Sequence, residues 1–135
     1  MGSTPESAVE EITMTAKCLD SDVLTKIKQE RSEAFVVKLI DLFLKDGPMR
    51  IQEAWEGGKA KDLKKVALSV QILRCLAENI GAVSLRDLAG AAEAAAAGGK
   101  ETSMFLAHIL FELEIAFAET RSCLLIARQG MSGTR

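Results

Sequence analysis

Tyrosine is absent from this 135-residue chain, which also has only two prolines, one tryptophan and one histidine. Because proline is scarce while alanine and leucine are common, helix is favoured along most of the chain. The single histidine, His108, excludes a metal site of the usual kind, since no suitably spaced group of other ligands accompanies it. We therefore expect neither a metal ion nor any other cofactor.

Charge and cysteine content exclude several further classes. Seventeen basic and nineteen acidic residues, without a basic stripe, provide no electrostatic footprint for nucleic acid. Cys18, Cys75 and Cys123 are odd in number and lack the paired spacing of zinc or redox motifs, which favours a reduced, cytoplasmic setting. No uncharged apolar run reaches the roughly 20 residues that span a bilayer, and residues 1–10 show no signal pattern. A soluble protein with no membrane partner is expected.

Apolar residues recur at helical spacing in the first half of the chain. A short helix is expected to begin at Asp20 or Ser21, and a longer one after Ser32, because these side chains can cap a helix. The stretch Asp46-Gly47-Pro48 should interrupt or kink the second helix, since proline lacks an amide donor. Gly57-Gly58 is expected to end it.

The second half predicts three more helices. One runs from about Asp62 to Ile80 and ends at Gly81, which suits a left-handed cap. Another begins with a capping box at Ser84-Leu85-Arg86-Asp87 and ends at Gly98-Gly99, and the last spans about Glu101 to Arg128. The predicted fold is all-α: an up-and-down antiparallel four-helix bundle with a short additional N-terminal helix. It occupies residues 20–129, between a flexible N-terminal segment at 1–19 and a flexible tail at 130–135.

The most informative motif is the segment Val70–Ala82, VQILRCLAENIGA. It resembles the core of the histidine-containing phosphotransfer (HPt) family, whose central helix reads roughly Ala-His-x-Leu-Lys-Gly-Ser-x-x-x-Ile/Leu-Gly-Ala. Leu42–Pro48 is similar to the stretch before that helix in the family, Gly81–Leu85 to the stretch after it, and Glu93 to a glutamate of the next helix. Counting forward from the first stretch or backward from the second places Gln71 at the histidine position.

The resemblance implies docking without chemistry. In the family, a histidine imidazole accepts a phosphoryl group from a receiver aspartate, a step that needs a nitrogen lone pair. The amide nitrogen of Gln71 is conjugated with its carbonyl, so no catalytic residue is expected. Nearby, Arg74 replaces a lysine, Cys75 a glycine and Leu76 a serine. The predicted function is therefore that of a non-catalytic pseudo-HPt protein, not an enzyme. It would bind a response-regulator receiver domain or a hybrid histidine kinase of a two-component phosphorelay and modulate signalling by occupancy.

The helix around Gln71 has a face that suits this role, because residues three and four apart lie on the same side. An apolar centre with a charged rim is typical of a protein-binding patch. The predicted partner-binding residues are Lys64, Leu68, Gln71, Ile72, Arg74, Cys75 and Glu78. The alternative is that a neighbouring helix buries Leu68, Ile72 and Leu76, and that Gln71 is an ordinary polar surface residue.

Two other functions fit the sequence. His108, with Glu112 one turn on, is a candidate substitute phosphoacceptor, which would make the chain an active phosphotransfer protein. A histidine in such an apolar helix is more often a structural residue. The second alternative is a helical adaptor or homodimer that associates through the patch of Leu68, Ile72 and Leu76.

Overall fold

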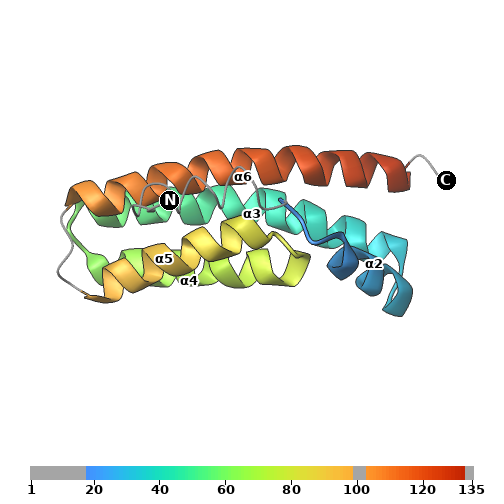
Figure 1. Cartoon of the computed structure of the whole chain (residues 1–135), viewed down its shortest axis with the longest axis horizontal. Helices are drawn as coiled ribbons and strands as arrows, with labels where there is room; N and C mark the ends of the chain where they lie inside the picture. Colours follow the sequence, from blue (N-terminus) through green and yellow to red (C-terminus); the bar gives the residue numbers. More distant parts are fainter. Residues whose placement is uncertain (1–17, 99–102, 133–135) are drawn as a thin grey trace, which may run out of the picture.

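A computed structural model describes residues 18–98 and 103–132 of the chain. Figure 1 shows long helices packed side by side, and the described residues contain no strand, which confirms the all-α prediction. No helix in these two ranges is long and apolar enough to cross a membrane. The helices are α2 (Ser21–Glu30), α3 (Glu33–Lys59), α4 (Leu63–Ile80), α5 (Val83–Gly98) and α6 (Ser103–Ser132).

The four longer helices enclose the core (Figure 1). Helix α3 packs against α4 and α6, and α5 packs against the same two helices, so α4 and α6 lie diagonally across the bundle. Helix α2 packs on α3 and α4. Of the segments expected to be flexible, 1–17 and 133–135 lie outside the described residues. Leu19 packs against the core, and residues 130–132 continue α6 past the expected end at Arg128.

Side-chain caps begin three of the helices where the sequence predicts them. Asp20, Ser32 and Asp62 each accept a hydrogen bond from a backbone N–H of the first turn that follows, at 3.0–3.1 Å. Gly81 ends α4 with φ of 81°, the left-handed conformation that glycine adopts without steric cost. The backbone N–H of Asp20 donates to the Gly81 carbonyl at 2.8 Å. The start of α2 is therefore fastened to the turn between α4 and α5.

Of the predicted interruption or kink at Asp46-Gly47-Pro48, the interruption is wrong, because α3 continues through Pro48; the kink stays a prediction. A proline inside a helix costs about 3 kcal/mol, through a lost hydrogen bond and a steric clash. Phe43 and Ile51, one turn before and after this stretch, are both buried in the core. Each buried side chain of this size contributes about 1.5–3 kcal/mol. Tertiary packing on both sides of Pro48 thus offsets the local penalty.

The predicted helix end at Gly57-Gly58 is also wrong, since both glycines lie within the last turns of α3. The chain turns instead at residues 60–62, where Lys61 has φ of 58°. Gly57 is buried, and a Cβ atom built on it would lie 2.9 Å from Val66 Cγ2 and 3.1 Å from the Val66 backbone nitrogen. Gly57 therefore lets α3 and α4 approach closely, which is a packing role rather than a turn role.

The capping box predicted for Ser84-Leu85-Arg86-Asp87 does not begin α5, because that helix begins at Val83. The Arg86 N–H donates to the Ala82 carbonyl at 2.9 Å, so Ser84 already lies inside the first turn. Ser84 and Leu85 are both buried. The tight turn at Gly81 brings the chain directly back onto α4, and α5 forms without a spacer.

The core is built from aliphatic side chains of all the helices and one aromatic pair. Phe43 of α3 and Phe117 of α6 stack with ring centroids 5.3 Å apart. Gly47 makes this possible, because a Cβ at that position would lie 2.9 Å from Phe117 Cζ. Near the C-terminal end of α6, Arg128 Nε and Nη2 donate to the two Asp41 carboxylate oxygens at 2.7 and 3.0 Å. These contacts hold the C-terminal half of α6 against α3.

Two of the three thiols are neighbours. Burial, and then a hydrogen bond to the Cys123 sulfur, raise the pKa of the Cys18 thiol from 9.0 to about 11. A thiol whose pKa is raised in the folded state stabilises the fold below its unfolded pKa, and this contribution is lost as pH rises through the folded pKa. We therefore expect stability to fall between about pH 9 and about pH 11.

Urea unfolding at several pH values in this range, under reducing conditions, would measure that loss. Cys18→Ser removes the titrating thiol with little change in size, so the variant should show a shallower decline than the parent chain. Lysine deprotonation affects both proteins equally and cancels in the comparison. Parallel declines in the two proteins would contradict the assignment to Cys18.

Candidate partner-binding face on α4

Two polar contacts mark the flanks of α4. On the α3 side, Ser69 Oγ donates to Glu53 Oε1 at 3.5 Å. On the α5 side, Arg74 Nε donates to Glu93 Oε1 at 3.0 Å. A helix advances about 100° per residue, so the positions between these flanks point out of the bundle. Gln71 lies there and is exposed.

The predicted partner-binding residues share this outer side of α4, but to different degrees. Leu68 is the most prominent apolar member, with 58% of its surface exposed. Ile72 is half-buried. The alternative that a neighbouring helix buries the patch is correct in part for Leu76, which is half-buried and packs against the core, and wrong for Leu68. The exposed polar or weakly polar members are Lys64, Gln71, Cys75 and Glu78.

Arg74 does not offer an isolated positive charge. Its guanidinium lies 3.0 Å from Glu93 Oε1 on α5 and 3.6 Å from Glu78 Oε2 one turn further along α4. The hydrogen bond and charge of Glu93, followed by Glu78, raise the pKa of Arg74 above its ordinary value. A phosphate at position 71 would therefore meet an arginine already paired with carboxylates. The pairing also orients the side chain across α4 and α5.

The sequence pattern did not anticipate the Arg74–Glu93 contact. Glu93 matched a family glutamate, yet its partner is nineteen positions away in sequence, and helix periodicity relates only residues on one helix. Gly90, one turn before Glu93 on α5, lies beside the Arg74 side chain, but the contact does not require a glycine there. A Cβ at Gly90 would lie 3.7 Å from Arg74 Cδ, an ordinary van der Waals distance.

His108 lies on α6, diagonally across the bundle from Gln71. It is half-buried, and its Nε2 atom is buried without a hydrogen-bond partner among the described residues. A ring nitrogen must be accessible to attack the phosphorus of an aspartyl phosphate. The buried Nε2 therefore does not suit a substitute acceptor. Over residues 18–98 and 103–132, no cluster of His, Cys, Asp and Glu side chains could hold a metal ion.

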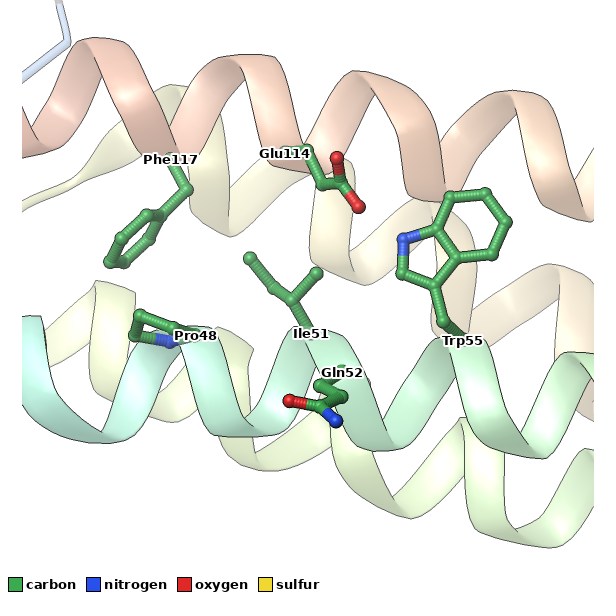
Figure 2. A pocket seen from close by; sticks show the side chains of 6 residues that line it. All are labelled: Pro48, Ile51, Gln52, Trp55, Glu114 and Phe117. Atoms are coloured by element: carbon green, nitrogen blue, oxygen red, sulfur yellow. The ribbon is translucent and has the colours of Figure 1, made fainter.

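A groove lies between α3 and α6 that the sequence pattern does not predict. Figure 2 shows Phe117 facing Pro48 at one end, Trp55 at the other end, and Glu114 between them on the same helix as Phe117. The groove has a volume of about 320 Å³ and is lined by Pro48, Ile51, Gln52, Trp55, Glu114 and Phe117. Trp55 Nε1 is buried without a hydrogen-bond partner in the described part of the chain. This mostly apolar groove contains no nucleophile and lies away from the outer side of α4.

Comparison with known proteins identifies the arrangement of helices. No protein-family model matches the chain, and no curated protein matches it. Among solved structures, the chain is similar to histidine-containing phosphotransfer protein B (HptB) from Pseudomonas aeruginosa PAO1, with a TM-score of 0.77 and 24% sequence identity. The chain has the HPt fold. The match covers 84% of this chain and 96% of HptB, so the similarity extends over most of both chains.

Proposed function

We propose that this chain is a non-catalytic HPt-like protein that binds receiver domains of a two-component phosphorelay and modulates signalling by occupancy. The observation that carries the proposal is Gln71, an exposed amide on the outer side of α4 in a chain with the HPt fold. Its partner would be a response-regulator receiver domain or the receiver of a hybrid histidine kinase. Within this proposal, α3 to α6 are the up-and-down antiparallel four-helix bundle, α2 is the additional helix, and the setting is cytoplasmic.

The outer side of α4 has the chemistry of a docking surface. Leu68 and Ile72 supply apolar area at the centre, and burying such area stabilises a complex. Lys64 and Glu78 are exposed charges about two turns from Gln71 on either side, where they can set orientation and association rate. Gln71 itself can donate and accept hydrogen bonds without adding charge. A receiver covered by this face would be unavailable to a phosphotransfer protein that has a histidine.

The active-phosphotransfer alternative rests on His108, and the geometry disfavours it. The Nε2 atom is buried, and the residue lies on the helix diagonal to α4. A receiver docked on α4 would place its aspartyl phosphate on the far side of the bundle. The adaptor alternative, which uses Leu68 as a self-association surface, competes for the same face and is distinguished by the experiment below.

Replacing Leu68 with glutamate should weaken receiver binding by roughly 1–3 kcal/mol, because a charged side chain would occupy the apolar centre of the interface. The measurement is a calorimetric or fluorescence titration against the receiver domains of the source organism. Since Leu68 is 58% exposed, the thermal unfolding midpoint of the variant should stay close to that of the parent chain.

Leu125→Glu is the matched control, because Leu125 is an exposed leucine on α6, the helix diagonal to α4. It should leave the affinity for a monomeric receiver unchanged. Equal losses of affinity in both variants, or no loss in either, would contradict the placement of the docking face on α4.

A further inference from the structure

Helix α6 is apolar on two sides. Its inner side buries Leu106, Leu113 and Leu124 in the core. Its outer side exposes Phe111 at 55% and Ile126 at 71%, together with Met104, Ile115 and Leu125. A solvent-facing helix surface is normally polar, and a continuous exposed apolar stripe marks an interaction site.

The outer residues follow the spacing of a coiled-coil seam. From position 108 onward the steps alternate between three and four residues, which keeps the side chains on one line along the helix. We call these residues the outer α6 face: His108, Phe111, Ile115, Ala118, Ser122 and Leu125. None of the six is fully buried by α3 or α5. At about 1.5 Å per residue, the face is about 25 Å long.

The outer α6 face is complementary to a reversed copy of itself. The steps read the same in both directions about a point between positions 116 and 117. A two-fold axis there would place Phe111 of one chain opposite Ser122 of the other, and Ile115 opposite Ala118. In these two layers a bulky side chain meets a small one, which allows close interdigitation, whereas in the outermost layer His108 would lie opposite Leu125. In a parallel arrangement, Phe111 would face Phe111 and Ser122 would face Ser122.

Charges beside the outer α6 face favour the reversed arrangement over a parallel one. Flanking positions on one edge of an antiparallel helix pair face their counterparts on the partner. This places Glu114 beside the second copy's Arg121, twice per two-fold pair. On the opposite edge, Glu112 would face Glu119, also twice per two-fold pair, which is unfavourable. A parallel pair would instead place Glu114 beside Glu119 and leave Arg121 without a carboxylate, so it lacks the favourable contact altogether.

We propose that a second copy of this chain packs antiparallel on the outer α6 face and forms a symmetric dimer. The contact consists of one helix from each copy. It is therefore expected to be smaller than a standard interface, which buries about 800 Å² per partner. The dimer should then be reversible and depend on concentration. Because α4 lies diagonal to α6, the outer side of α4 stays uncovered in both copies of the dimer. If this side binds receivers as proposed above, the dimer has two receiver sites, and it would bind two tethered receivers more tightly than a single chain binds one.

Sedimentation velocity of the full chain over a range of concentrations tests the dimer. The parent chain should shift from monomer to dimer as concentration rises. Phe111→Glu should weaken self-association by roughly tenfold or more, because it puts a charge at the centre of the seam. Phe111 is exposed in the single chain, so circular dichroism should show an unchanged helix content and melting temperature. A parent chain that stays monomeric at every concentration would overturn the proposal.

Charge exchange tests the antiparallel register separately. Arg121→Glu should weaken the dimer, and the double variant Glu114→Arg with Arg121→Glu should restore it, since the favourable pair is re-formed with its signs reversed. Failure of the double variant to recover would overturn the register. A dimer that persists in Phe111→Glu but is lost in Leu68→Glu would overturn the proposal and place self-association on α4. Receiver titrations run in parallel distinguish this failure from failure of the docking function.

Discussion

Incubation with a receiver domain that carries a radiolabelled aspartyl phosphate should leave this chain without label. Gln71 lies on the outer side of α4, and its amide nitrogen has no available lone pair for attack on phosphorus. The receiver should lose its label only by hydrolysis to inorganic phosphate, with no transfer to the chain. Gel autoradiography, with acid and base treatment to distinguish phosphohistidine from phosphoserine, makes the measurement.

The informative variant restores a nucleophile. Gln71→His combined with Cys75→Gly provides an imidazole and removes an exposed thiol one turn away that would crowd an approaching receiver. Label on this double variant and none on the parent chain would show that docking survives and that residue 71 decides the chemistry. Acid-labile, base-stable label on the parent chain at His108 would refute the non-catalytic proposal.

Gly57→Ala should destabilise the fold by about 1–3 kcal/mol, although alanine is the better helix former. The added Cβ would lie 2.9 Å from Val66 Cγ2, 3.1 Å from the Val66 backbone nitrogen and 3.2 Å from the Asp62 carbonyl oxygen. Two of these atoms belong to the backbone, and the valine side chain is stiff, so α3 and α4 must separate to relieve the contact. Urea unfolding measures the loss.

Gly58→Ala is the neighbouring control. A Cβ there meets Leu110 Cδ1 at 3.9 Å, an ordinary contact, so the variant should be neutral or gain up to about 1 kcal/mol from helix propensity. The two variants differ by one position and have the same change in propensity. Equal stabilities would contradict the close approach of α3 and α4 at Gly57.

Short-range chemistry was predictable from the sequence alone. Asp20, Ser32 and Asp62 cap their helices because the side-chain oxygen and the backbone N–H that it accepts from lie within three residues. Gly81 is left-handed for an equally local reason. Gln71 could be placed on the exposed side of its helix because periodicity relates residues of one helix to each other. The absence of a nucleophile at that position is likewise a property of the residue itself.

Other features were decided by tertiary packing. Whether Pro48 breaks α3 depends on how much Phe43 and Ile51 gain by burial, and that gain exists only once α6 lies against them. Gly57 serves helix packing rather than a turn because α4 returns along α3 at close range.

Tertiary packing also decided which side chains are exposed on the surface. The chain sequence alone determined five helices, the caps at Asp20, Ser32 and Gly81, and the chemistry of the Gln71 amide, because each depends on neighbours a few residues apart. The tertiary structure decided that Leu68 is exposed while Leu76 packs inward, and that Glu93 pairs with Arg74. It also decided that α6 buries one apolar side and leaves the other uncovered. These outcomes depend on which helix lies next to which, and the periodicity of a single helix carries no such information.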